Sequence, residues 1–281
     1  MKVIVSDPIS NDGIEILTKN GIDVVNISNK DINDCLQHIN NANGWIIRSG
    51  TTINEKIINQ ASNLSVIGRA GVGIDNIDIV QATRRGIVVM NTPDSNTISA
   101  AEHTMALILS LSRNINLGHY DIMNGKWNRN KFIGSELFNK SLGIIGLGKI
   151  GRAVMRRSLA FNMKVYGYDP YLSEEHFGDD DINIVDLDYL ISNSDYITLH
   201  MPLTKDTKGL FDYNKLSKMK QSARIINVAR GGIINERDLS ILLKENKIAG
   251  AAIDVFESEP ISNDNPLTSA PNIILTPHLG A

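Results

Sequence analysis

The chain has 281 residues, one cysteine and no long apolar run, and these shortages narrow its class. A single cysteine excludes a disulfide framework and a cysteine-based zinc site, so we expect Cys35 to be a half-buried small hydrophobe and no metal to bind. No apolar run reaches the roughly 18 residues that span a membrane. The chain starts on a strand-like KVIVS rather than a secretory signal, so the cytoplasm is the expected compartment.

An excess of positive charge is also missing. With 28 Lys and Arg against 31 Asp and Glu, the net charge is −3, which gives no reason to expect nucleic acid as a partner. The composition, 42% hydrophobic and 21% charged, is that of an ordinary globular protein. The length allows one large or two medium domains with a sizeable core.

A glycine-rich segment organises the sequence. It begins with a short apolar strand, Leu142–Ile145, followed by Gly146, Gly148 and Gly151 in the spacing G-x-G-x-x-G. A predicted helix at about Lys149–Phe161 comes next, and then a second strand, about Met163–Tyr168, which is followed by the acid Asp169. In a dinucleotide site the three glycines allow a tight turn, close approach of the pyrophosphate and close helix packing. The helix start offers N–H groups to the anion, and the acid binds ribose hydroxyls. The alternative is a glycine-rich turn without a ligand, but the four parts together favour a dinucleotide cofactor.

Strand and helix patterns alternate on both sides of this segment. Before it we expect strands at Val3–Val5, Val24–Ile27, Trp45–Ile47, Val66–Ile67 and Ile87–Met90, with helices near Gly13–Lys19, Ile32–Ile39, Glu55–Ala61 and Ile77–Arg85. One long helical segment follows, from Thr97 to about Met123. After the glycine segment come strands at Tyr196–Leu199, Arg224–Val228, Ala251–Asp254 and Ile273–Leu275, with helices near Leu187–Ile191 and Glu236–Glu245. This alternation predicts an α/β fold with two doubly wound parallel-sheet domains, residues 1–94 and 95–281, the second of Rossmann type.

Three further stretches each follow a predicted strand, where ligands of parallel sheets bind. NVARGG (227–232) carries Arg230, DVFESEP (254–260) carries Glu259, and TPHLGA (276–281) carries His278. Taken singly, these residues could be a solvated arginine, a surface acid and a packed imidazole. The chain has six histidines, and the side chains of the other five need no function on the sequence alone.

The combination resembles a known family, the D-isomer-specific 2-hydroxyacid dehydrogenases. The resemblance covers essentially the whole chain through seven ordered motifs: GRAGVGIDNID (68–78), NTPDSNTISAAEHT (91–104), GLGKIG (146–151), HMPLT (200–204), NVARGG, DVFESEP and TPHLGA. RSGTTI (48–53), together with GKW followed by Arg129, is similar to the branch that oxidises D-3-phosphoglycerate for serine synthesis. The alternatives are a glyoxylate, hydroxypyruvate or other 2-oxoacid reductase of this family, and a non-catalytic NAD-sensing protein.

The resemblance implies a role for each catalytic residue. Arg230 would bind the substrate carboxylate and the oxygen on C2 through its planar guanidinium. His278 would take the C2 hydroxyl proton as hydride leaves for the nicotinamide. Glu259 would orient the imidazole and favour its charged form. The substrate would be a small 2-hydroxy acid.

The resemblance also implies the binding residues. NAD would be bound by the glycine motif, by backbone N–H groups of Lys149 and Ile150, by Asp169, and by the cleft residues Val72, His200, Met201, Pro202, Val228, Ala229 and Asp254. The first domain would act as the substrate-binding lid and contribute Arg48 and the stretch Arg69, Gly71, Val72 and Gly73. The family usually forms a dimer or a dimer of dimers through the segment after Thr97, so Arg129 would act across the interface. Family members continue after HLGA with a helix that returns to the first domain; for a chain ending at Ala281 we expect some of that domain's apolar surface to face water.

Overall fold

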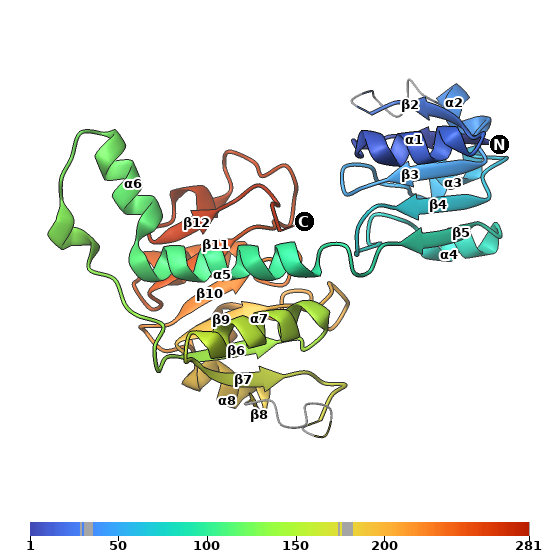
Figure 1. The fold of residues 1–281 in the computed structure, drawn as a ribbon. Helices are drawn as coiled ribbons and strands as arrows, with labels where there is room; N and C mark the ends of the chain where they lie inside the picture. The colour runs from blue at the N-terminus through green and yellow to red at the C-terminus, as the bar shows by residue number, and fades with distance from the viewer. Residues whose placement is uncertain (29, 31–35, 174, 176–181, 281) are drawn as a thin grey trace. The chain divides into compact units, whose positions relative to one another are not determined.

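The structure is a computed structural model that describes residues 1–28, 30, 36–173, 175 and 182–280. The chain divides into two compact units, Met1–Asn96 (unit 1) and Thr97–Ala281 (unit 2). The sequence placed the boundary after residue 94, and the structure places it after Asn96, directly before the first helix of unit 2. Each unit is an α/β layer structure built on its own parallel sheet (Figure 1).

Unit 1 has five parallel strands in the order β2-β1-β3-β4-β5. Their bounds are Lys2–Val5 (β1), Asp23–Asn26 (β2), Gly44–Ile47 (β3), Val66–Arg69 (β4) and Val88–Asn91 (β5), and the helices are Asn11–Lys19 (α1), Leu36–Asn40 (α2), Glu55–Gln60 (α3) and Ile79–Arg84 (α4). The central strands supply fully buried side chains such as Ile4, Trp45 and Ile67, as expected of a sheet covered on both faces. Of the helix predicted at Ile32–Ile39, residues 32–35, with Cys35, lie outside the described part, and the described remainder belongs to α2.

Unit 2 has seven parallel strands in the order β12-β11-β10-β9-β6-β7-β8. Their bounds are Ser141–Ile145 (β6), Lys164–Tyr168 (β7), Ile182–Ile184 (β8), Tyr196–Leu199 (β9), Arg224–Asn227 (β10), Gly250–Ile253 (β11) and Ile273–Leu275 (β12). The strand order reverses between β6 and β9, which gives the Rossmann arrangement and places the ligand crevice at the carboxyl ends of these two strands.

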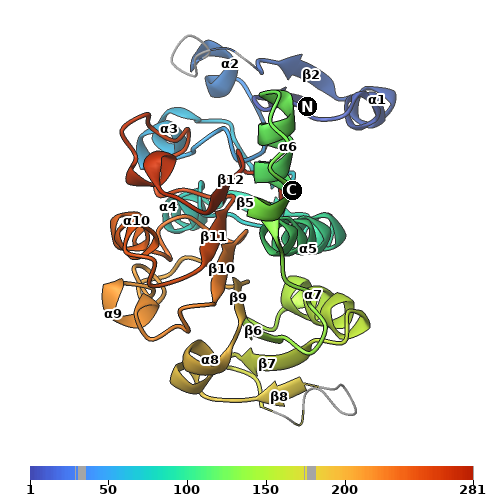
Figure 2. The same ribbon diagram turned by 90° about the vertical axis from the view of Figure 1, so that its left-hand side faces the viewer.

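Helices cover both faces of this sheet, as Figure 2 shows. One face packs against Thr97–Arg113 (α5) and Lys149–Ala160 (α7), and the other against Leu187–Asn193 (α8), Tyr213–Leu216 (α9) and Glu236–Lys244 (α10). Each face has its own apolar core, one including Ile108 and Val154, the other Leu190 and Leu242. The predicted fold of two doubly wound parallel sheets is confirmed.

The single helix predicted from Thr97 to about Met123 is wrong. The helix is interrupted at Asn114, whose φ of 52° is left-handed. Helix α5 therefore ends at Arg113, and a second helix, α6, spans Ile115–Met123. Asparagine tolerates this conformation better than other non-glycine residues, which makes it a break point that periodicity alone does not show.

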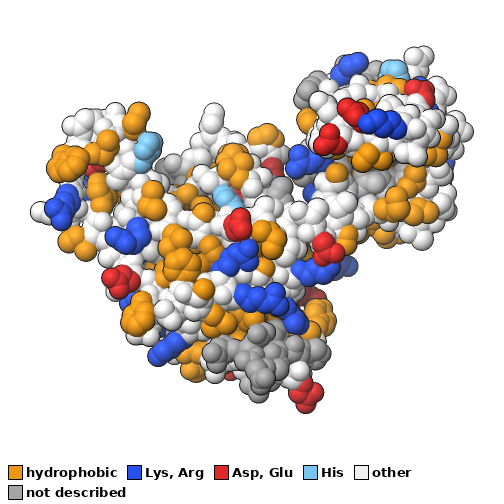
Figure 3. Space-filling model, in the orientation of Figure 1, with side chains coloured by type: hydrophobic (Ala, Val, Ile, Leu, Met, Phe, Trp, Pro, Cys, Tyr) orange, Lys and Arg blue, Asp and Glu red, His pale blue; other side chains and the backbone are white. Residues whose placement is uncertain are grey.

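Helix α6 and the short 3₁₀ helix η2 (Arg129–Phe132) form an arm that extends from the end of α5 (Figure 1). Figure 3 shows hydrophobic side chains gathered on this arm. The exposed ones include Ile115, Tyr120, Ile122, Met123, Trp127 and Ile133. No helix among the described residues is long and apolar enough to cross a membrane.

Candidate active site

The glycine turn after β6 is built by close contacts that exclude side chains. Gly146 has a φ of +93°, and a Cβ there would lie 2.4 Å from the His200 carbonyl oxygen. A Cβ on Gly151 would lie 2.1 Å from the Gly146 carbonyl oxygen, so helix α7 packs directly on the turn. Gly148 begins α7 without a side-chain cap, and a Cβ there would meet nothing within 4 Å. The turn therefore leaves open space at a helix N-terminus, which suits the pyrophosphate of a dinucleotide.

Asp169 lies beside this turn because it follows β7, the neighbour of β6. Its Oδ2 accepts a hydrogen bond of 2.9 Å from the Leu147 N–H, inside the glycine turn, and its Oδ1 accepts one of 3.0 Å from the Tyr171 N–H. The carboxylate is therefore fixed at the carboxyl edge of the sheet, where an acid can bind ribose hydroxyls.

His200 follows β9 on the other side of the strand-order reversal. Its backbone forms one wall of the glycine turn, and its ring Nε2 lies 3.0 Å from the Thr198 hydroxyl. Burial lowers the pKa of His200 to about 3, so the imidazole is neutral at physiological pH. His200 can line a cleft but cannot exchange a proton near neutrality. Its predicted neighbours in the cleft lie at two strand ends: Met201 and Pro202 after β9, and Val228 and Ala229 after β10.

Arg230 stands in a tightly held loop after β10. The Asn227 side chain accepts from the Ala229 N–H (3.0 Å) and donates to the Arg230 carbonyl (2.9 Å). A Cβ on Gly231 would lie 1.8 Å from the Phe256 carbonyl oxygen, so this loop packs against the one after β11. The glycine thus brings the arginine loop next to the loop that carries Glu259.

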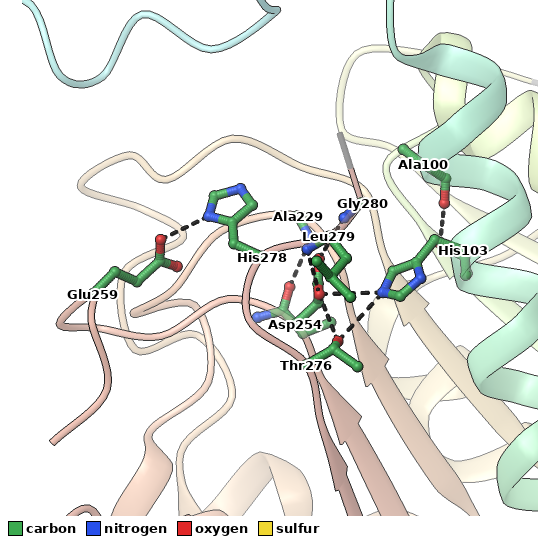
Figure 4. A network of polar contacts seen from close by, with 11 residues as sticks. Ala100, His103, Ala229, Asp254, Glu259, Thr276, His278, Leu279 and Gly280 are labelled. Atoms are coloured by element: carbon green, nitrogen blue, oxygen red, sulfur yellow. Dashed lines mark hydrogen bonds and ion pairs between the residues drawn. The ribbon is translucent and has the colours of Figure 1, made fainter. Parts of the chain in front are cut away.

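Glu259 and His278 form a direct pair (Figure 4). Glu259 Oε2 lies 2.7 Å from His278 Nδ1, while Oε1 accepts a 3.0 Å hydrogen bond from the Phe256 N–H. Burial by itself would raise the pKa of Glu259, but these two hydrogen bonds and the charges of His278 and Arg230 lower it overall. The carboxylate is therefore ionised, and Nε2 of the imidazole is left to act on a substrate.

His278 has an unusual backbone. Its φ is 54°, in the left-handed region, and every other described non-glycine residue with positive φ is an asparagine. A residue held in this region is strained by roughly 1–3 kcal/mol and persists only where its surroundings fix it. Strain of this kind is concentrated at functional sites.

The surroundings are supplied by Asp254, whose side chain is fully buried at the end of β11. Oδ1 accepts from the Leu279 N–H at 2.8 Å and from the Thr276 hydroxyl at 2.5 Å, and Oδ2 accepts from the Gly280 N–H at 2.9 Å. One carboxylate therefore binds the loop on both sides of His278. The family resemblance implies that Asp254 lines the NAD cleft, and the hydrogen bonds of its carboxylate give it this second role.

In unit 1 the predicted substrate residues also follow strands. Arg48 comes after β3, and its N–H donates at 2.6 Å to the buried carboxylate of Asp7 after β1. Arg69 ends β4, and its guanidinium occupies the place that a Cβ on Gly71 would take. Val72 and Gly73 follow, with the Val72 carbonyl accepting from the Asn91 amide at 2.7 Å. Arg129 begins η2 in the arm of unit 2, and η2 packs against α6 rather than following a strand.

Sequence reasoning missed two residues that hold these loops. Asp7 accepts from the N–H groups of Arg48 and Thr51. His103 on α5 places Nε2 3.1 Å from Asp254 Oδ1. His103 lies in one of the motifs quoted above, but its partner is 151 positions away, so only the fold reveals the contact. Among the described residues there is no cluster of three or more His, Cys, Asp or Glu that could bind a metal.

Comparison with known proteins decides the family. The family model "D-isomer specific 2-hydroxyacid dehydrogenase, NAD binding domain" matches residues 105–280. The chain belongs to the D-isomer specific 2-hydroxyacid dehydrogenase family. The predicted family and its cofactor, NAD, are therefore confirmed.

Individual relatives agree. Over 281 residues the chain is 44% identical to D-3-phosphoglycerate dehydrogenase of Archaeoglobus fulgidus, covering all of this chain and 53% of that protein. Among solved structures it is similar to the Staphylococcus aureus NAD-dependent formate dehydrogenase in complex with NAD (TM-score 0.89, 31% identity, 100% of this chain and 89% of that chain). It is also similar to Aquifex aeolicus D-lactate dehydrogenase with NAD and lactic acid (TM-score 0.88, 26% identity, 100% and 88%). The chain spans about half the length of the curated relatives that it matches.

Proposed function

We propose that this chain carries the catalytic part of an NAD-dependent dehydrogenase that oxidises the C2 hydroxyl of D-3-phosphoglycerate to 3-phosphohydroxypyruvate, the first step of serine synthesis. The observation that carries the chemistry is the Glu259–His278 pair at 2.7 Å, beside the loop of Arg230. The specific substrate rests on the 44% identity to a D-3-phosphoglycerate dehydrogenase and on the arginines of unit 1 and the arm. We also propose that the protein is located in the cytoplasm.

NAD fits the residues present. The open space at Gly148, the start of α7 and the fixed carboxylate of Asp169 match its pyrophosphate and ribose. Lys149, Ile150 and the residues after β9 and β10 would complete the site, with Asp254 near the carboxamide and Val72 from unit 1. When bound, NAD supplies the acceptor for the hydride that leaves C2.

The protein groups perform the remaining work. Arg230 binds the substrate carboxylate with two parallel N–H groups and fixes the C2 oxygen. His278 Nε2 accepts the hydroxyl proton as the C2–H bond breaks, so the proton remains on the imidazole, the electron pair of the C2–H bond leaves with the hydride, and the substrate becomes a 2-oxo acid. The Glu259 carboxylate stabilises the imidazolium that forms and holds the ring through Nδ1.

The substrate phosphate brings nearly two negative charges and calls for cationic donors. We assign this role to Arg48 and Arg69, positioned with Gly71, Val72 and Gly73, and to Arg129. Arg129 belongs to η2, which packs on α6 rather than at a strand end, so we infer that it acts on the site of a second subunit. The exposed apolar side chains of the arm support a homodimer, because patches of this kind mark interfaces.

The test is turnover by the purified chain. With NAD, D-3-phosphoglycerate should produce NADH, the L-isomer should not, and Arg230→Ala should abolish the signal. D-lactate, D-glycerate and formate tested in parallel separate the phosphoglycerate enzyme from other members of the family. NAD binding without turnover of any of these acids would instead support a non-catalytic NAD sensor.

A further inference from the structure

A buried carboxylate with several hydrogen-bond donors lies next to the catalytic pair in unit 2. The buried Asp254 carboxylate accepts two backbone N–H groups and a hydroxyl from the loop Thr276–Gly280, and His103 approaches the same oxygen from helix α5 (Figure 4). His103 Nε2 is 3.1 Å from Asp254 Oδ1 and 3.3 Å from the Thr276 hydroxyl oxygen. The imidazole is 18% exposed and the Asp254 side chain 0%.

The chemistry of the partners fixes the direction of this hydrogen bond. The Asp254 carboxylate only accepts, so Nε2 of His103 carries the proton and donates. The Thr276 hydroxyl donates its hydrogen bond to the same carboxylate, so the Thr276 hydroxyl oxygen is a second acceptor for the Nε2–H of His103. His103 thus binds both the carboxylate and the first residue of the loop.

The loop needs such support. His278 sits in a left-handed conformation that is unfavourable for a residue with a Cβ. Its flanking residues, Thr276 on one side and Leu279 and Gly280 on the other, are all bound to Asp254. Backbone hydrogen bonds also hold Thr276 and His278 to the end of β11. The Asp254 carboxylate adds the contacts to Leu279 and Gly280 beyond His278, so a rotation of the carboxylate would release that flank together with the Thr276 hydroxyl.

We propose that His103 is a positioning residue for the dehydrogenase reaction: by holding Asp254 and Thr276 from helix α5, it keeps His278 aligned with Glu259. This inference rests on the proposed function for its kinetic consequence. It does not rest on it for its structural consequence, which concerns the loop alone. The residue touches neither substrate nor reacting atoms.

Two amide variants test the hydrogen bond with matched chemistry. His103→Gln places an N–H donor near the position of Nε2, whereas His103→Asn carries the same amide on a side chain that is one methylene too short. We expect His103→Asn to lower kcat about 10- to 100-fold, the range for a lost hydrogen bond to a charged group. The KM for D-3-phosphoglycerate should stay within about threefold, because the arginines that bind it are untouched. His103→Gln should restore most of kcat. Glu102→Gln, an exposed neighbour on α5 that pairs with Arg157, is the control and should change nothing.

A second readout does not depend on activity. Hydrogen exchange of the Leu279 and Gly280 amides, which donate to Asp254, should accelerate in His103→Asn and stay slow in His103→Gln. If the Asn and Gln variants have the same kcat and the same exchange rates, the proposal is overturned and His103 merely packs α5 on the sheet. If the parent protein turns over no 2-hydroxy acid, the proposed function fails, and the exchange comparison still decides the role of His103.

Discussion

Replacing Glu259 by Gln should change the pH dependence of catalysis. Gln keeps the size of Glu and can still accept a hydrogen bond from His278 Nδ1, but it removes the negative charge 2.7 Å from the ring. Without this charge the imidazolium form is less stable. In the reduction direction, where activity falls as the pH rises, this fall should occur at lower pH in the variant. In the oxidation direction, where activity rises with pH, the rise should also occur at lower pH.

The size of this shift follows from the geometry. A hydrogen bond to a charged group contributes about 1.5–3 kcal/mol and a neutral one roughly half of that. The side chains of His278 and Glu259 are 31% and 36% exposed, so solvent screening favours the low end of the difference, about 1 kcal/mol. One pH unit corresponds to about 1.36 kcal/mol, so the midpoint should move by roughly half a unit to one unit.

The assay is kcat/KM against pH in both directions, with Glu257→Gln as the matched control. Glu257 is an exposed acid two positions away in the same loop, and its replacement should leave the profile in place. His200, with its pKa near 3, does not titrate in the range tested. An unchanged midpoint in Glu259→Gln, or a midpoint moved to higher pH, would refute the pairing of Glu259 with the catalytic imidazole.

Three further predictions concern stability, substrate and cofactor. Burial alone would raise the pKa of Asp195, but hydrogen bonds from Ser141 and Lys220 lower it overall. The ionised carboxylate therefore stabilises the folded protein at neutral pH, and this contribution is lost as the pH falls below about 4. Asp195→Ala should lower the melting temperature at pH 7 and leave it equal to that of the parent protein in acid. Arg129→Ala should raise the KM for D-3-phosphoglycerate by about one to two powers of ten, and the KM for NAD and for an unphosphorylated acid should stay nearly unchanged. If Arg129→Ala, Arg48→Ala and Arg69→Ala all leave the KM for D-3-phosphoglycerate unchanged, these arginines do not form the phosphate site. NAD should be strongly preferred over NADP because Asp169 repels a 2′-phosphate, and Asp169→Ser should narrow the preference; a parent enzyme that prefers NADP would contradict this.

The sequence predicted the features that depend on residues close together in the chain. The glycine spacing and the apolar strands predicted both parallel sheets, and the residues after β10, β11 and β12 were correctly placed at strand ends. It failed where one residue's conformation or a distant partner decides the outcome. Asn114 ends α5 by adopting a left-handed φ that no hydrophobic period reveals. His103 and Asp7 reach their partners only once the chain is folded, 151 and 41 positions away.

Asp254 illustrates the same limit. The family resemblance implied a cofactor contact for Asp254, but the donors that fill its carboxylate come from a loop more than twenty positions later and from helix α5. The left-handed backbone of His278 follows from the folding of that loop. Histidine is one of the residue types enriched in this region, but a positive φ is uncommon for any non-glycine residue, so the sequence alone does not reveal it.

The most direct test of the central claim follows the hydrogen on C2. D-3-phosphoglycerate carrying deuterium at C2 is incubated with NAD and the protein, and the reduced cofactor is analysed by NMR. If Arg230, Glu259 and His278 perform the proposed reaction, the deuterium appears on the nicotinamide ring, and His278→Asn lowers its rate of appearance by several powers of ten. Reduced cofactor without deuterium, or an equal rate in His278→Asn, would contradict the account.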